Sequence, residues 1–378
     1  MNGHRDQRPD GLAGYEYHRS GPVTLYLGDA RRVLAAMPDA VVTSPPFWSL
    51  RDYGTGRWSG GDFDCPHPGR QRRLNGARCV RCPAVWIDPQ YGLESTIEQY
   101  VDRLVGVFDE VRRVLSPTGT CWLNLGDSYS APGRRAQPTS GATPATNTAS
   151  MLPAKNLIGV PWRVAFALQT SGWWLRNAVI WSKTNPMPES VADRLSTTYE
   201  LLFLLTTSQN YYFDLDPIRV PLARPEAADG TRIIGGARKG ATGGIGPTAR
   251  RRGATAYGGK YTTDTATEPR AGAGNLKPLG HAHTAAHPRG RNPGDVWRIA
   301  TRPYRGSHVA PFPIDLPLRA IAAGCPPGGV VLDPFSGAGT TGLAATRLGR
   351  RYIGVDIAAR FHDEAITRLR PHLPGGSG

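Results

Sequence analysis

Residues 330–356 combine a short apolar run, a glycine-rich turn, a stretch of helical composition and a second run that ends in an acid. The first run is typical of a buried strand that stops at Asp333 and the proline after it. Gly337 and Gly339 allow the backbone to turn tightly and a ligand to approach it closely. Strand, glycine loop, helix, strand and acid make up half of a nucleotide-binding α/β sheet, in which a carboxylate placed like Asp356 binds ribose hydroxyls.

The glycine pattern by itself leaves the nucleotide open. Residues 337–342, Gly-Ala-Gly-Thr-Thr-Gly, satisfy the dinucleotide fingerprint, and Asp356 follows at the expected spacing. Asp333-Pro-Phe335 precedes the glycines, and an acid there repels a pyrophosphate but suits a ligand that carries an ammonium group. The stretch therefore favours S-adenosylmethionine, with a dinucleotide, or a loop that only makes a turn, as alternatives.

The bulk properties limit the class of protein. A chain of 378 residues suggests two or three domains, and a formal net charge of +15 indicates a polyanionic partner such as nucleic acid. Apolar runs are too short for a membrane span, and the first residues lack the apolar core of a signal peptide. Five cysteines in this length argue against a disulfide framework and favour a reducing cytoplasm.

A second motif, Thr43-Ser44-Pro45-Pro46-Phe47-Trp48, follows the predicted strand 40–43. Two consecutive prolines after a strand make a stiff loop whose carbonyls are not all used by the sheet. Such a loop suits methylation of an exocyclic amino group on a flipped-out base. Two fixed acceptors, the Ser44 hydroxyl and the Pro45 carbonyl, localise the lone pair of the amine, while Phe47 with Trp48 stacks on the base. The alternative is a Pro-Pro loop that merely ends a strand.

The two motifs together, in this order, resemble the amino-methylating DNA methyltransferases of bacteria and phages, in the circularly permuted β group of that family. The resemblance implies a doubly wound, mostly parallel, seven-stranded Rossmann-like sheet with an antiparallel edge hairpin. It also implies S-adenosyl-L-methionine as cofactor, double-stranded DNA as substrate, a cognate restriction endonuclease as a partner, and a monomer or homodimer. The location it implies is the cytoplasm of a bacterium or of a phage-infected cell, at the nucleoid.

The resemblance also implies roles for particular residues. The catalytic residues would be Ser44, Pro45, Pro46 and Phe47, and the target base would further contact Trp48, Lys183 and Asn185. The cofactor would be bound by Asp333, Phe335, Ser336, Gly337, Gly339, Thr340, Asp356, Asp29 and Phe312. In the family, serine before Pro-Pro accompanies cytosine N4 more often than adenine N6. We therefore expect cytosine N4 methylation, with adenine N6 methylation as the alternative.

Four side chains between the two motifs have the spacing of a structural zinc knuckle. Cys65-Pro-His67 is followed, eleven residues later, by Cys79-Val-Arg-Cys82. Two close pairs of soft ligands are typical of a closed tetrahedral site, which is structural rather than catalytic. The alternative is a loop with ordinary thiols.

The predicted domains follow from these motifs and from changes in composition. Residues 21–220 would form the catalytic half of the methyltransferase domain, with a zinc-knuckle insertion at 60–92 and a flexible loop at 130–150. Residues 221–295 are rich in Gly, Ala, Thr and basic residues, and the resemblance implies that they form the target-recognition and DNA-binding region, partly disordered; the alternative is a linker with incidental charge. Residues 296–378 would form the cofactor-binding half. We expect residues 199–205 and 211–213 to pair as the edge hairpin, and Ser95 to cap a helix over residues 97–115.

Two other classes of protein are consistent with parts of the sequence. A dinucleotide-dependent oxidoreductase would use the glycine loop but would have to bind nicotinamide. A DNA-binding protein without catalytic activity would explain the charge but would leave the Ser44 and Asp333 motifs without a role.

Overall fold

The computed structural model describes residues 12–34, 38–67, 76–130, 152–222, 287, 289–304, 306 and 311–373. The chain divides into two compact units, residues 1–217 with 294–378, and residues 218–293. In the second unit, Val220 and Arg291 form an antiparallel bridge. Residues 131–150 of the predicted loop, and most of the predicted recognition region 221–295, lie outside the described residues. The fold and the site below belong to the first unit.

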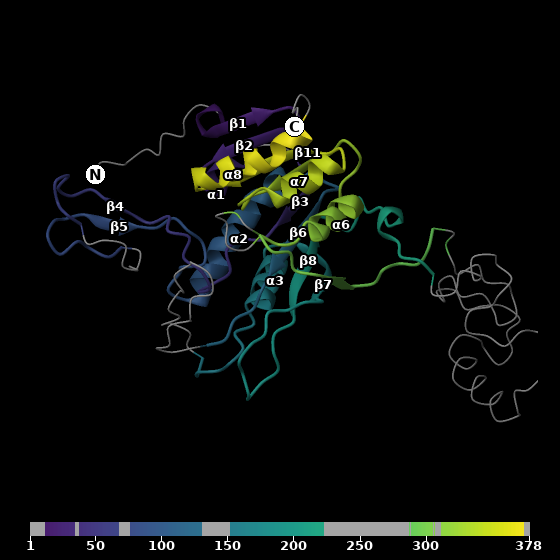
Figure 1. Cartoon of the computed structure of the whole chain (residues 1–378), viewed down its shortest axis with the longest axis horizontal. Coiled ribbons are helices and arrows are strands. Elements are labelled where there is room, and N and C mark those ends of the chain that lie inside the picture. Colours follow the sequence, from purple (N-terminus) through teal and green to yellow (C-terminus); the bar gives the residue numbers. More distant parts are fainter. Residues whose placement is uncertain are drawn as a thin grey trace, which may run out of the picture. The chain divides into compact units, whose positions relative to one another are not determined.

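The described part of the first unit is built on one nine-stranded sheet in the order β1-β2-β11-β10-β3-β6-β8-β7-β9 (Figure 1). Strands β2, β11, β10, β3 and β6 are parallel, β8 is antiparallel to both of its neighbours, and β9 is parallel to β7. The strands are β1 (Glu16–Ser20), β2 (Val23–Leu27), β3 (Ala40–Thr43), β6 (Thr120–Leu125), β7 (Trp174–Lys183), β8 (Tyr199–Thr206), β9 (Val296–Ile299), β10 (Val330–Asp333) and β11 (Arg351–Asp356).

Helices and short elements complete the fold. The α-helices are α1 (Ala30–Val33), α2 (Ile97–Val114), α3 (Val160–Thr170), α6 (Asp315–Gly324), α7 (Thr340–Arg347) and α8 (Ala359–Leu369). A separate antiparallel pair, β4 (Arg57–Ser59) and β5 (Val85–Ile87), lies to one side of the main sheet (Figure 1). The described residues also form the short 3-10 helices η1 (Leu12–Tyr15), η2 (Asp216–Ile218) and η5 (Arg370–His372). Among the described helices, none has the length and apolarity needed to cross a bilayer.

Both faces of the sheet are buried, as expected for parallel strands covered by helices. Alternate residues of β6 show this, because Cys121 and Leu123 belong to the core cluster formed with α2 and α3. Trp122 points the other way, toward α6, where a side chain at Gly324 would collide with the Trp122 indole and with Thr120. Helices α1, α2 and α3 pack together, and so do α6, α7 and α8. The sheet therefore lies between two helical layers.

The predicted α/β architecture is confirmed, with corrections at the edges of the sheet. The sheet has nine described strands rather than seven, because β1 and β9 add one strand at each end. The predicted hairpin partner 211–213 is wrong, since β8 pairs with β7 and Tyr212 instead donates its backbone N–H to the Thr118 carbonyl. The cap of α2 is Thr96, which accepts a hydrogen bond from the Gln99 N–H, rather than Ser95.

The strand order brings together segments that are far apart in the chain. Strand β10 pairs with β3 on one side and with β11 on the other, all three parallel. The loops that follow β3, β10 and β11 therefore leave the same edge of the sheet side by side. Ligands of open α/β sheets bind at this carboxyl edge.

Candidate functional site

A cavity of about 690 Å³ lies at the carboxyl edge of the sheet, within the size range of small-molecule sites. Both sequence motifs line it. The predicted residues along its wall are Ser44, Pro45, Pro46, Phe47, Lys183, Asn185, Phe312, Asp333, Phe335, Ser336, Gly337, Thr340 and Asp356. Ser44 and Gly337 thus face one cavity although 293 positions separate them in the sequence.

Three predicted residues do not line the cavity. The prediction that Trp48 stacks on the target base is corrected, because its side chain is 1% exposed in the core and its indole N–H donates to the Glu94 carbonyl. Asp29 caps α1 by accepting from the Arg31 N–H, while its neighbours Gly28 and Ala30 line the wall. Gly339 has a left-handed φ of 72°, and a Cβ there would lie 2.8 Å from the Ala365 methyl group, so its glycine allows α7 to pack on α8.

Asp333 joins the two motifs directly. Its buried carboxylate accepts hydrogen bonds from the Thr43 hydroxyl at 2.6 Å, the Thr341 hydroxyl at 2.7 Å and the Phe335 N–H at 3.0 Å. Thr43 immediately precedes Ser44, so the acid of the glycine loop fixes the start of the Pro-Pro loop. A direct contact of Asp333 with a cofactor ammonium group stays a prediction.

Asp356 sits at the tip of β11 and accepts from the backbone N–H groups of Gly337 and Ala358, each at 2.9 Å. Gly337 has a φ of 48°, which lets its N–H turn toward this carboxylate. Burial raises the pKa of Asp356 to about 6, and burial raises the pKa of Asp333 to about 6 as well. Both acids are therefore ionised at neutral pH but close to protonation in mild acid.

Ser44 is oriented by a chain of polar side chains from four strands or strand ends. Its hydroxyl donates to the Asn124 carbonyl oxygen at 3.0 Å. The Asn124 amide in turn donates to the Glu200 carboxylate at 3.1 Å and to the Leu201 carbonyl at 3.2 Å, which fixes which end of the amide faces Ser44. Glu200 is held by Lys183 at 2.7 Å. Because the Ser44 proton is engaged, the hydroxyl presents acceptor lone pairs to the cavity.

The remainder of the Pro-Pro loop is also fixed. The Pro46 carbonyl accepts from the Tyr100 hydroxyl at 2.9 Å, whereas the Pro45 carbonyl accepts no hydrogen bond from the described residues. The Phe47 ring lies against Gly126, where a Cβ would come within 2.6 Å of it. The loop therefore offers one unused carbonyl beside the Ser44 hydroxyl, and an aromatic face.

Asn185 lies in the wall but its side chain is engaged. It donates to the Thr301 carbonyl at 3.1 Å and accepts from the Thr301 N–H at 2.7 Å. The segment after β9 is thereby tied to the loop after β7. Contact of Asn185 or Lys183 with a target base stays a prediction.

Sequence reasoning missed several residues of the wall. Asn124 and Glu200 each interrupt an apolar strand, and a buried polar residue in such a run was the available signal. Gln90 and Tyr91 also line the cavity, and the Tyr91 ring packs edge-on against Phe335 with centroids 5.2 Å apart. No local pattern marks these two residues, because they come from the end of the predicted knuckle insertion.

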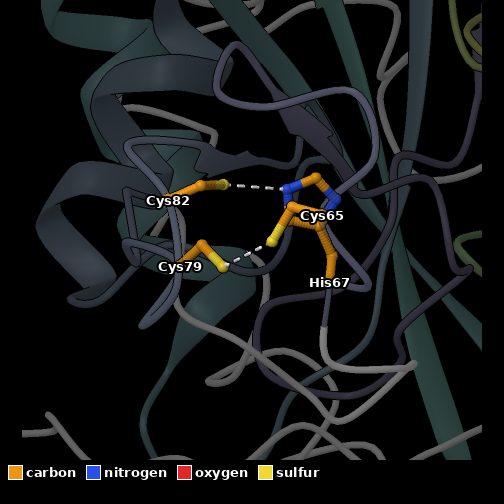
Figure 2. A group of neighbouring side chains, drawn as sticks. All are labelled: Cys65, His67, Cys79 and Cys82. Carbon is orange, nitrogen blue, oxygen red and sulfur yellow. Dashed lines mark hydrogen bonds between the residues drawn. The ribbon is translucent and has the colours of Figure 1, made fainter.

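The four predicted metal ligands converge (Figure 2), and the His67 ring stacks on Trp58 of β4. The ligand atoms of Cys65, His67, Cys79 and Cys82 all lie within 4.8 Å of one another. The Cys65 and Cys79 sulfurs are 3.9 Å apart, and His67 Nε2 is 3.2 Å from the Cys82 sulfur. Thiolates bound tetrahedrally at about 2.3 Å are about 3.8 Å apart, so the donor set fits a zinc ion.

Comparisons with known proteins agree with this geometry. A family model described as DNA methylase, for N6 and N4 methyltransferases, matches residues 39–367. The type II methyltransferase M.Cfr9I of Citrobacter freundii is 33% identical, over 95% of this chain and 93% of its own. M.SmaI of Serratia marcescens is 32% identical over 91% and 90%. The solved cytosine-N4-specific PvuII DNA methyltransferase has the same fold, with a TM-score of 0.52, 15% identity, and coverage of 95% and 91%.

Proposed function

Since the chain belongs to the N6/N4 DNA methylase family and is a DNA amino-methyltransferase, we propose that it methylates N4 of cytosine in duplex DNA, with S-adenosylmethionine as the methyl donor. One observation carries the choice of chemistry. Ser44, with its proton held by Asn124, faces the same cavity as Gly337 and Asp356. The Ser44 hydroxyl and the glycine loop thus line the same cavity, where the target amine and the cofactor could meet.

The cofactor would occupy the side of the cavity formed by the glycine loop. The Asp356 carboxylate, fixed by the Gly337 and Ala358 N–H groups, is placed to accept from ribose hydroxyls. Phe335, braced by Tyr91, offers an aromatic face to the ligand. When bound, S-adenosylmethionine supplies a methyl group already activated by its sulfonium.

The Pro-Pro loop would hold the target amine. The two hydrogens of the amine would be donated to the Ser44 hydroxyl and the Pro45 carbonyl. These two hydrogen bonds would draw the nitrogen lone pair out of conjugation with the ring and toward the methyl donor. The methyl group would pass from the sulfonium to the nitrogen, leaving S-adenosylhomocysteine, and the methylated amine would release one proton to solvent. The Phe47 ring would stack on the extruded base.

Cytosine is our choice because serine before Pro-Pro accompanies cytosine N4 more often than adenine N6 in the family; the Ser44 hydroxyl could accept from either amine, so adenine N6 is the alternative. The test is mass spectrometry of nucleosides from duplex DNA incubated with purified protein and deuterated S-adenosylmethionine. We expect labelled N4-methylcytosine, and none with Ser44→Ala, whereas the exposed control Ser59→Ala should retain activity. Labelled N6-methyladenine would overturn the choice of base. Labelled 5-methylcytosine would overturn the amino-group chemistry.

We also propose that Cys65, His67, Cys79 and Cys82 bind a structural zinc ion, as their spacing and geometry support. Elemental analysis should find about one zinc per chain. Cys82→Ser should lose the metal, whereas Cys325→Ser, at a buried cysteine outside the cluster, should keep it. Protein purified without chelator that holds no zinc would contradict the proposal.

The family also supports a biological setting. We infer that the enzyme acts in a bacterial or phage-infected cytoplasm and protects DNA from a partner endonuclease of the same specificity. DNA methylated by the protein should resist such an endonuclease. Residues 221–295 are our proposed recognition region.

A further inference from the structure

The insertion that carries the Cys/His cluster returns to the active site through residues 88–94, here called the return segment. The Tyr91 side chain, 3% exposed, packs edge-on against Phe335 of the cofactor loop. Its hydroxyl donates to Asp29 at 3.4 Å, at the start of α1. The return segment thus supports the side of the cavity assigned to the cofactor.

The same segment contacts the Pro-Pro loop. The Gly92 carbonyl accepts from the Ser49 N–H at 2.8 Å, and the Glu94 carbonyl accepts from the Trp48 indole at 3.0 Å. Gly92 has a φ of 88°, and a Cβ there would lie 2.7 Å from the Phe47 carbonyl oxygen. The backbones of the two segments are therefore packed without space for a side chain between them.

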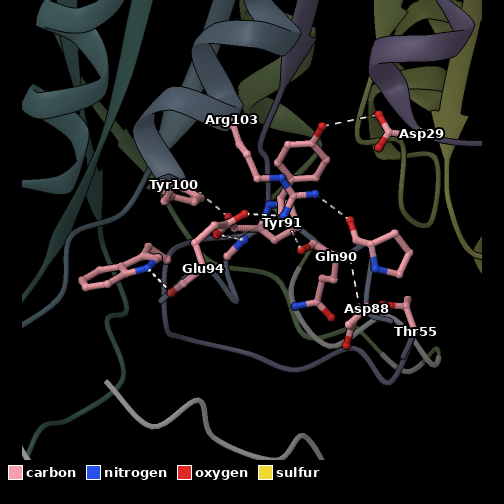
Figure 3. A network of polar contacts seen from close by, with 12 residues as sticks. Asp29, Thr55, Asp88, Gln90, Tyr91, Glu94, Tyr100 and Arg103 are labelled. Atoms are coloured by element: carbon pink, nitrogen blue, oxygen red, sulfur yellow. Dashed lines mark hydrogen bonds and ion pairs between the residues drawn. The ribbon is translucent and has the colours of Figure 1, made fainter. Parts of the chain in front are cut away.

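Arg103 of α2 clamps the return segment (Figure 3). Its guanidinium donates to the Glu94 carboxylate at 2.6 Å, to the Gln90 carbonyl at 3.0 Å and to the Pro89 carbonyl at 2.9 Å. It also lies 4.0 Å from the centroid of the Tyr91 ring. One cation thus fixes the backbone just before Tyr91, the Glu94 carboxylate after it, and the Tyr91 ring itself.

The outgoing arm of the insertion, just before β4 begins, is tied to the returning arm, just after β5 ends. Gln90 accepts from the Tyr53 N–H at 2.7 Å and donates to the Arg51 carbonyl at 2.8 Å. The Thr55 hydroxyl donates to Asp88 at 2.6 Å. The insertion is therefore closed at its near end by these bonds and at its far end by the Cys/His cluster.

We propose that the insertion, closed by a metal ion bound to the Cys/His cluster, holds Tyr91 in place and so shapes the S-adenosylmethionine site, with Arg103 as the positioning residue at its base. The proposal rests on the proposed function and on zinc in the cluster. It differs from a role of the knuckle in gripping DNA, because the contacts of the return segment lead to Phe335 and Asp29 rather than to an outer surface. Loss of metal or of Arg103 should then weaken cofactor binding selectively.

The test is calorimetric titration of the full-length protein with S-adenosylmethionine, beside a DNA-binding measurement. The samples are untreated protein, chelator-treated protein, Arg103→Gln, Arg103→Lys, and the matched control Arg113→Gln on the exposed side of the same helix. Arg103→Gln should weaken cofactor binding about 10–150-fold, the effect of losing one hydrogen bond made by a charged group, and metal removal should weaken it in the same direction. The cofactor affinity of Arg103→Lys should lie between those of wild type and Arg103→Gln, since an ammonium group can keep the ion pair with Glu94 but not the hydrogen bonds to both carbonyls. Arg113→Gln should bind the cofactor normally, and DNA affinity should change less than about twofold throughout.

The outcomes separate the proposals. Untreated protein that binds no S-adenosylmethionine would overturn the proposed function, and this inference with it. Normal cofactor binding after metal removal and in Arg103→Gln would overturn the inference alone. Loss of DNA affinity with normal cofactor binding would overturn it in favour of a DNA-gripping knuckle. If Arg103→Gln fails to fold, Tyr91→Leu replaces it in the series, with the same expected loss of cofactor affinity.

Discussion

Replacing Asn124 by alanine tests how Ser44 is prepared for its role. Asn124 is 1% exposed and is the acceptor of the Ser44 proton at 3.0 Å. Without it, the hydroxyl can turn its proton into the cavity and meet the target amine as a donor rather than an acceptor. The lost contact is one neutral hydrogen bond, worth about 0.5–1.5 kcal/mol, which corresponds to a factor of about 2–12 in rate. Because the misdirected proton also repels the amine, we expect the upper part of that range.

The assay is the single-turnover rate of tritium transfer from labelled S-adenosylmethionine to duplex DNA at saturating concentrations of both. Asn124→Ala should lower this rate about 5–12-fold while cofactor affinity is kept. The control is Asn156→Ala, where an exposed amide donates to the nearby Pro153 carbonyl and, within the described part of the chain, to no other group. A rate for Asn124→Ala within about twofold of the control would refute the idea that this hydrogen bond sets the acceptor.

Three further predictions follow from the same site. Thr43→Val removes a hydroxyl donor 2.6 Å from the buried Asp333 carboxylate, and it should lower the free energy of unfolding by about 1–3 kcal/mol in chemical denaturation. Thr43→Ser should be close to wild type, and equal stability of all three proteins would contradict the prediction. Because burial raises the pKa of Asp356 to about 6, protonation should weaken S-adenosylmethionine binding as the pH falls through about 6. Asp356→Asn should bind weakly and show a smaller pH dependence than wild type, since Asp333 still titrates near the same pH; a wild-type affinity that is constant from about pH 8 to 5 would argue against this role. Phe47→Ala should cost about 1–3 kcal/mol in binding of duplex DNA with an unpaired target base, and unchanged affinity would exclude stacking.

The central fold was predictable because its signals are local. The apolar runs before Ser44 and Asp333 are short, end at prolines, and become the parallel neighbours β3 and β10. The order of the motifs, with the Pro-Pro loop before the glycine loop, then indicated the circularly permuted order of the two halves of the domain. The glycine loop and the Cys/His spacing are equally local, since each is contained within about 20 residues.

The edges of the sheet were not predictable in the same way. Strand β1 reads Glu-Tyr-His-Arg-Ser, with little apolar character, and is specified by its pairing with β2. Strand β9 has only four residues and pairs with β7, more than 110 positions earlier in the chain. In both cases tertiary pairing decides the structure of a segment that has weak intrinsic preference.

The site was predicted as two loops but not as a network. The Ser44–Asn124 bond spans 80 positions, and its geometry depends on β3 and β6 being neighbours in register. The direction of a side chain after a Pro-Pro turn also depends on contacts with distant segments. For this reason Trp48 was predicted in the cavity but lies in the core, with its indole N–H donating to the Glu94 carbonyl. The closure of the cavity by Tyr91 depends on where a long insertion returns.

The most direct test of the account is the structure of a ternary complex with duplex DNA and sinefungin, whose amino group stands in place of the transferred methyl group. We expect a flipped cytosine with its N4 within hydrogen-bonding distance of the Ser44 hydroxyl and the Pro45 carbonyl. The measured quantity is the distance from that N4 to the sinefungin amino group, expected at about 3–3.5 Å. A cytosine that stays stacked in the duplex, or an N4 that points away from both acceptors, would contradict it.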